Sequence, residues 1–129
     1  MDKKILLVDD SSTTLLMEEM LFREHTNYEL LLARNGEEAL QTAIAESPSL
    51  ILMDVIMPKM DGFSACREMR RHPALRRVPI IMVTSRGESC NVEQGFESGC
   101  NDYVTKPING AELIEIVNGY LMGLGQIVR

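Results

Sequence analysis

Short apolar runs alternate along this chain with stretches in which apolar residues recur at helical spacing. The runs predict five β-strands, at residues 4–8, 28–33, 50–53, 78–83 and 102–104. A helical stretch follows each run, so strand and helix alternate five times. Repeated βα units of this length are typical of a parallel sheet with helices on both faces. We therefore expect one doubly wound α/β domain.

The polarity of each run predicts its place in the sheet. The runs at 5–8, 50–53 and 80–83 are continuously apolar, as expected of central strands that are covered on both faces. The runs at 28–30 and 102–104 carry polar residues, as expected of edge strands. A strand order of 2-1-3-4-5 fits this polarity, and other orders fit it as well.

Capping residues and helix breakers predict the five helices. Ser11 and Ser12 can cap the first helix, which carries Leu16, Met20 and Leu21. The second helix is expected to start at Gly36 and to stop near residues 47–48. The third is expected to start at Asp61 and to end at residues 72–73.

The last two helices have unusual compositions. The fourth, expected at 88–98, is weakened by Gly95 and by several polar residues. The fifth, expected at 110–122, has an apolar arc about 160° wide, broader than the roughly 100° that a core-facing stripe needs. We expect the domain to span residues 1–122 and residues 123–129 to form a tail or linker stub.

Composition and charge narrow the possible functions. The chain has 129 residues, of which 45% are hydrophobic, and this fraction argues against disorder. Its 19 acidic and 13 basic residues give a net charge of −6, so we do not expect direct nucleic-acid binding. The apolar run at 5–8 is too short for a signal peptide or a membrane span. Three cysteines without a Cys-x-x-Cys pair fit a reducing cytoplasm.

The residues that close the strands carry the candidate chemistry. In an open parallel sheet, ligands bind at the carboxyl ends of the strands. Asp9 and Asp10 follow the first strand, Asp54 follows the third, Thr84 follows the fourth and Lys106 follows the fifth. These side chains are therefore expected to meet at one edge of the sheet.

Three carboxylates at one edge repel one another unless cations intervene. Lys106 supplies only one positive charge, so a hard divalent cation with oxygen ligands, Mg²⁺, is expected to complete the balance. A metal, a lysine and the Thr84 hydroxyl would together stabilise a phosphoryl group. Asp54 would then be the carboxylate nucleophile.

At these residues the chain resembles the receiver domain of two-component response regulators. The matching motifs are Asp9–Asp10, the run from Asp54 to Gly62, Thr84–Ser85 and Lys106–Pro107. The resemblance covers residues 1–122 and implies a flavodoxin-like fold with five helices and strand order 2-1-3-4-5.

The resemblance implies a role for each residue. Asp54 would accept a phosphoryl group from a sensor histidine kinase or a phosphotransfer protein. Asp10 and Asp54 would bind Mg²⁺ directly, Asp9 through water, and Ile56 through its backbone carbonyl. Lys106 and Thr84 would contact the phosphoryl oxygens, and a cis bond before Pro107 would aim the lysine inward.

The resemblance also implies a switch. The Thr84 hydroxyl would move toward the phosphoryl group and Tyr103 would turn inward, altering the face formed by the fourth helix, fifth strand and fifth helix. The alternative for Tyr103 is that it is an edge-strand aromatic residue that packs against a neighbour and has no role in switching. That face would control binding to a downstream protein target or a fused output domain, and a phosphorylation-dependent homodimer is possible there.

Two positions beside the phosphoryl group would tune its lifetime. Ile56 has no polar atom to orient an attacking water, and Arg86 could pair with the phosphoryl charge. We therefore hypothesise slow self-dephosphorylation. The alternative is that both are surface residues without a kinetic role.

Other functions remain open from the residues alone. A small phosphohydrolase would share the aspartate, Mg²⁺ and lysine, but its two aspartates are usually separated by one residue, whereas Asp9 and Asp10 are adjacent. A flavin phosphate at Ser11–Thr14 would be repelled by those aspartates. We therefore expect a signalling module that catalyses only its own phosphorylation and dephosphorylation. Five arginines at residues 67–77 are either a docking patch for an acidic partner or a solvated helix end.

Overall fold

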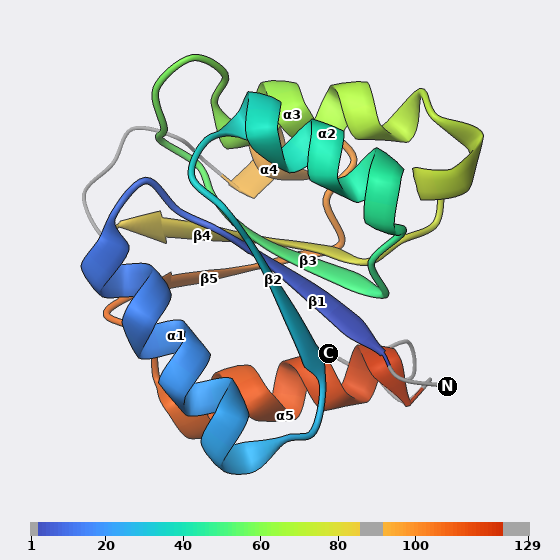
Figure 1. The fold of residues 1–129 in the computed structure, drawn as a ribbon. Helices are drawn as coiled ribbons and strands as arrows, with labels where there is room; N and C mark the ends of the chain where they lie inside the picture. The colour runs from blue at the N-terminus through green and yellow to red at the C-terminus, as the bar shows by residue number, and fades with distance from the viewer. Residues whose placement is uncertain (1–2, 86–91, 123–129) are drawn as a thin grey trace.

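The computed structural model describes residues 3–85 and 92–122, and it contains a five-stranded parallel sheet (Figure 1). The strands are β1 (Lys4–Val8), β2 (Glu29–Ala33), β3 (Leu50–Asp54), β4 (Ile80–Ser85) and β5 (Asp102–Lys106). Their order is β2-β1-β3-β4-β5, so the flavodoxin-like order that fits the strand polarity and that the resemblance implies is confirmed. The two strands with polar residues, β2 and β5, are the edges.

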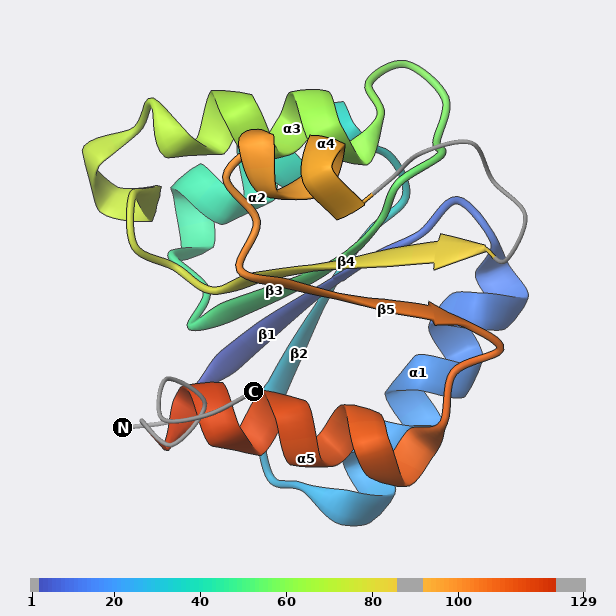
Figure 2. The ribbon, with the colours of Figure 1, turned by 180° about the vertical axis from the view of Figure 1, so that it is seen from behind.

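Helices cover both faces of the sheet (Figures 1 and 2). One face carries α1 (Ser12–His25) and α5 (Gly110–Leu121), and the other carries α2 (Gly36–Glu46), α3 (Gly62–Arg70) and α4 (Val92–Glu97). A short 3₁₀ helix, η1 (Pro73–Leu75), follows α3 and was not predicted. None of these helices is long and apolar enough to cross a membrane, within the described residues.

Alternation along the strands builds two separate cores. In β1, Leu6 and Val8 pack toward α2 and α3, whereas Ile5 and Leu7 pack toward α1 and α5. All four side chains are buried. Strands covered on both faces must be apolar at every position, which is why their sequences are continuous apolar runs.

The helix starts follow the predicted capping chemistry. Ser11 is the N-cap of α1, and its hydroxyl accepts a hydrogen bond from the Thr14 amide at 3.2 Å. Asp61 caps α3 by accepting from the Ser64 amide at 2.8 Å. Ser12 is the first residue of α1 and makes no cap of its own.

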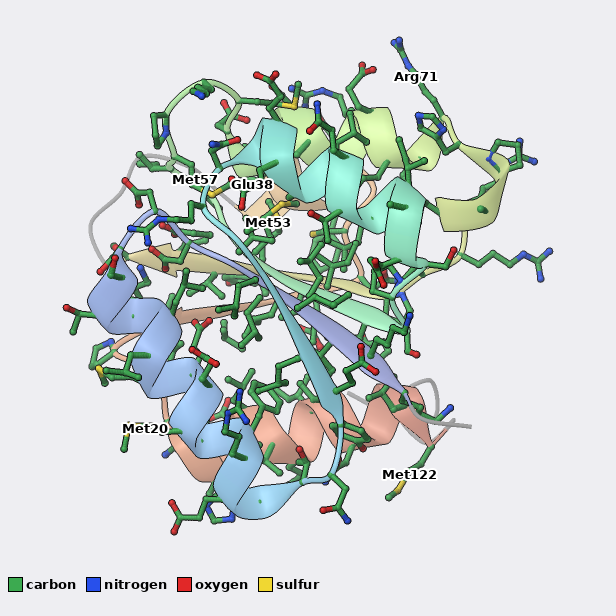
Figure 3. The ribbon with its side chains drawn as sticks, viewed as in Figure 1. Met20, Glu38, Met53, Met57, Arg71 and Met122 are labelled. Carbon is green, nitrogen blue, oxygen red and sulfur yellow. The ribbon has the colours of Figure 1, made fainter. Side chains whose placement is uncertain are left out.

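The apolar residues predicted on the first helix divide between the interior and the surface. Leu21 packs partly buried against the core, whereas Leu16 and Met20 are exposed. Figure 3 shows Met20 pointing away from the body of the molecule. Leu15, Glu18 and Phe22 form the buried face instead.

Candidate functional site

Two buried carboxylates lie at the carboxyl ends of adjacent central strands. Asp9 follows β1 and Asp54 ends β3, and only 1% and 6% of their surfaces are exposed. Asp10 is exposed beside them. Carboxylate oxygens of the three residues lie within 4.8 Å of one another. The parallel pairing of β1 with β3 brings both strand ends to one edge and so creates this cluster.

Backbone amides orient the two buried carboxylates. Asp9 Oδ1 accepts a hydrogen bond from the Ser11 amide at 2.9 Å. Asp54 Oδ1 accepts one from the Val55 amide at 3.0 Å. Both donors belong to the residues just after the strands, so the same turns that begin the next segments hold the carboxylates in place.

Lys106, the last residue of β5, reaches both carboxylates. Its Nζ atom lies 3.2 Å from Asp9 Oδ2 and 3.7 Å from Asp54 Oδ2. Burial alone would lower the pKa of Lys106, but the charges of Asp54 and Asp9 outweigh it and raise the pKa. The lysine is therefore held in its charged form. The Lys106–Pro107 peptide bond is cis.

The donor atoms at this edge suit a hard divalent cation. One ammonium against three carboxylates leaves excess negative charge, and every donor is an oxygen, the ligand type that Mg²⁺ prefers. The two histidines lie elsewhere, at the end of α1 and before η1. The residues present therefore fit Mg²⁺ better than zinc.

The loop after β3 folds back closely against Asp54. Gly62 donates its amide to the Val55 carbonyl at 2.7 Å. A Cβ atom at Gly62 would collide with the backbone carbonyl of Asp54, so glycine is required by this close approach. Ile56, in the same loop, is 58% exposed, and its side chain offers no polar atom.

Thr84 lies at the same edge of the sheet as Asp54, whereas Tyr103 packs on the face of the sheet that α2 and α3 cover. Asp54 pairs with Val83, so Thr84 is one step further along the neighbouring strand. Tyr103 is partly buried against the core under α2 and α3. Its ring meets the ring of Phe96 in α4 edge-on, with the two ring centroids 6.4 Å apart. Arg86, predicted to flank the phosphoryl group, lies outside the described residues.

Sequence reasoning missed Glu18, a buried carboxyl beneath this edge. Glu18 is 4% exposed, and its Oε1 atom has no hydrogen-bond partner among the residues that the structure describes. Burial and then Asp9 raise the pKa of Glu18 to about 8, with Lys106 opposing and Asp54 adding to the rise. The signal was its position, because Leu15 and Phe22 flank Glu18 at helical spacing on the buried face.

The arginine run at 67–77 is not uniform. Arg70 turns inward, where its guanidinium donates to the carbonyls of Gly99, Leu75 and Val78 at 2.8–2.9 Å. Arg71 extends from the surface, as Figure 3 shows. At least one member of the run therefore has a structural role instead of forming an exposed patch.

Comparison with known proteins identifies the family. The chain matches the model of the response regulator receiver domain over residues 5–118. It is 46% identical, over 112 residues, to the probable transcriptional regulator ycf27 of Pyropia yezoensis, a match that covers 86% of this chain and 44% of that protein. The chain spans about half the length of the curated relatives it matches.

Solved structures agree with that match. A putative response regulator from Chloroflexus aurantiacus superposes with a TM-score of 0.88 at 37% identity, covering 95% of this chain and 99% of that one. The receiver domain of sensor histidine kinase PA1611 from Pseudomonas aeruginosa, which holds a magnesium ion in its active-site cleft, gives 0.86 at 34% identity with the same coverage. With sequence, strand order and acidic edge in agreement, this chain belongs to the response regulator receiver domains of two-component systems.

Proposed function

We propose that Asp54 accepts a phosphoryl group from the phosphohistidine of a sensor histidine kinase or a phosphotransfer protein. A carboxylate oxygen of Asp54 forms the new bond to phosphorus while the bond from phosphorus to the histidine nitrogen breaks. The observation that supports this role is the ammonium of Lys106 at 3.2 and 3.7 Å from two buried carboxylates. This position supports a role for Lys106 in neutralising oxygens of an incoming phosphoryl group.

The remaining residues at this edge would support the transfer. Asp10 and Asp54 would hold Mg²⁺ directly, with Asp9 acting through water and Ile56 through its backbone carbonyl. When bound, Mg²⁺ supplies positive charge that offsets the charge of the phosphoryl oxygens. The Thr84 hydroxyl would donate a hydrogen bond to one of those oxygens.

The output would pass through the face formed by α4, β5 and α5. Movement of Thr84 and rotation of Tyr103 would change this face and with it the binding of a downstream protein, a fused output domain or a second copy. Because the matched relatives are about twice as long and include named transcriptional regulators, a fused output domain deserves the first test. We expect this signalling to take place in the cytoplasm.

Intact-mass measurement after incubation with acetyl phosphate tests the proposal. We expect one added phosphoryl group that requires both Mg²⁺ and Asp54, so that Asp54→Asn stays unmodified. Asp61→Asn is the matched control, because asparagine also caps helices well and Asp61, the N-cap of α3, is not part of the acidic cluster.

Two results would contradict the proposal. An adduct that persists in Asp54→Asn would place the modification elsewhere. Steady release of phosphate without an adduct would instead favour a phosphohydrolase.

A further inference from the structure

The side chain of Arg34 reaches from the end of β2 to the turn that carries Asp10. Its Nη2 atom donates to the Asp10 carbonyl at 3.4 Å and to the Ser12 hydroxyl at 2.5 Å. These two acceptors lie on either side of Ser11, the N-cap of α1. One guanidinium group therefore spans the turn between β1 and the first helix.

The backbone is held on both sides of Arg34. Ala33, the last residue of β2, accepts a hydrogen bond from the Asp9 amide at 3.2 Å through its carbonyl. The side chain of Asn35, the N-cap of α2, accepts one from the Glu38 amide at 2.8 Å. Arg34 thus lies between a paired strand end and a capped helix start. Its guanidinium acts from a fixed base, although the residue itself is exposed.

Asp10 is the member of the acidic cluster that has the least support of its own. Asp9 and Asp54 are buried, and backbone amides and Lys106 contact their carboxylates. Asp10 is exposed, and no hydrogen bond or ion pair among the described residues involves its carboxylate. The direction of this carboxylate therefore depends on the backbone of Asp10, whose carbonyl Arg34 holds.

We propose that Arg34 is a positioning residue for the metal site, because it holds the turn that brings the Asp10 carboxylate within 4.8 Å of those of Asp9 and Asp54. This role rests on the proposed function, in which Asp10 binds Mg²⁺ directly. A residue that holds a metal ligand in place raises the metal affinity without touching the metal. The positive charge of Arg34 acts in the opposite sense, since it repels a divalent cation.

Substitution by lysine separates position from charge. Arg34→Lys keeps the charge and removes the planar group that spans the two acceptors. We expect its Kd for Mg²⁺ to rise about threefold to tenfold, measured by amide chemical shifts of the full chain during titration with MgCl₂. Ser12→Ala removes one acceptor and should weaken binding in the same direction, and the two effects should not add in the double variant.

Arg23→Lys is the matched control. Arg23 is an exposed arginine in the last turn of α1, where it pairs with Glu19 at 3.1 Å. The acidic cluster lies instead beside the start of this helix, after β1. Arg23→Lys should therefore leave the Kd for Mg²⁺ unchanged.

Hydrogen exchange without metal tests the turn directly. The Ser11 amide donates to Asp9 Oδ1, so in EDTA it should exchange severalfold faster in Arg34→Lys than in the wild type. The Val55 amide, which donates to Asp54 Oδ1 after β3, should exchange at the same rate in both proteins. A general loss of stability would instead speed both amides.

The outcomes distinguish this role from the proposed function. Equal Kd values in Arg34→Lys and in a wild type that binds Mg²⁺ would overturn only the role of Arg34. Unchanged binding in Arg34→Lys with tighter binding in Arg34→Gln would also overturn it, because Arg34 would then act through its charge alone. Failure of the wild type to bind Mg²⁺ would contradict the metal site of the proposed function, and the role of Arg34 with it.

Discussion

At the scale of single residues, Glu18 makes stability depend on pH in an unusual direction. Its pKa rises from 4.5 to about 8 on folding, so the folded state binds the proton more tightly than the unfolded state. The stabilisation that this tighter proton binding gives the folded state is complete below pH 4.5 and is lost as the pH rises toward 8. Most carboxylates in proteins, whose pKa is lowered by folding, act in the opposite sense.

We therefore expect Glu18→Gln to become progressively more stable than the wild type as the pH rises. Between pH 4.5 and 8 the difference in the free energy of unfolding should change by up to about 1.4 kcal/mol per pH unit. Urea unfolding across this range, with EDTA to remove divalent cations, measures it. Parallel stability curves for the two proteins would contradict the raised pKa, and Glu19→Gln is the control.

Ile56 gives a prediction about the lifetime of the phosphorylated state. Its exposed side chain offers no hydrogen bond to an attacking water, so Ile56→Asn should shorten the lifetime of phosphorylated Asp54 severalfold. Loss of the phosphoryl adduct followed by intact mass provides the rate. Ile44→Asn is the matched control, since Ile44 is similarly exposed on α2. An unchanged lifetime in Ile56→Asn would mean that Ile56 is only a surface residue.

Individual site residues were predictable when a strand end determined their position. Asp9 and Asp54 follow apolar runs directly, Lys106 follows the run at 102–104 after Thr105, and parallel strands bring such residues to one edge. Glu18 was missed because a charged residue is usually exposed, although Leu15 and Phe22 flank it at helical spacing on the buried face. Its environment comes from Asp9, Asp54 and Lys106, which are distant along the chain.

At the scale of elements, α4 contains a glycine that can be replaced. A Cβ atom at Gly95 would lie 3.5 Å from Cys100 Sγ and from a ring carbon of Phe63, which is ordinary van der Waals contact. Gly95→Ala should therefore raise the free energy of unfolding by about 0.5–1 kcal/mol, since alanine favours the helix. Urea unfolding tests this.

Gly62→Ala is the matched comparison, with the opposite sign. Its Cβ would collide with the backbone carbonyl of Asp54, so we expect a loss of about 1–3 kcal/mol. If Gly95→Ala destabilised the protein as much, α4 would be packed more tightly than these distances indicate.

Helix boundaries were predicted better than helix orientation. Capping residues placed the starts of α1 and α3 correctly, because a cap acts on the amides directly after it. The buried face of α1 was ambiguous, since Leu16 and Met20 have the same helical spacing as buried apolar pairs do. Only packing against the sheet and α5 decides which face is covered.

At the scale of the whole molecule, Arg70 connects segments that are far apart in sequence. Its guanidinium donates to the carbonyls of Leu75, Val78 and Gly99 and, at 2.8 Å, to Asn101 Oδ1. It thereby joins the end of α3 to the segments that precede β4 and β5. A lysine has neither the planar shape nor enough donors for this arrangement.

Arg70→Lys should consequently lower the free energy of unfolding by about 2–3 kcal/mol. The side chain of Arg71 is 77% exposed, so Arg71→Lys should change the free energy of unfolding by less than about 0.5 kcal/mol. Thermal or urea unfolding of both variants compares them. Equal effects would mean that the inward bonds of Arg70 add nothing to stability.

The polarity of the strands predicted which of them are edges, but several strand orders fit it, and the resemblance to receiver domains selected the observed one. The arginine run could not be divided in the same way, since Arg70 and Arg71 are adjacent and chemically identical. Arg70 differs because carbonyls lie around it, and backbone acceptors leave no mark in a sequence.

The alternation that builds the two cores also governs which insertions and deletions the chain can tolerate. Removing one residue from β1 would exchange the side chains that face α1 and α5 with those that face α2 and α3. The same deletion would turn Asp9 away from Lys106. In the central strands, a change of length is therefore linked to loss of the acidic cluster. Insertions and deletions are expected to be tolerated only outside these strands.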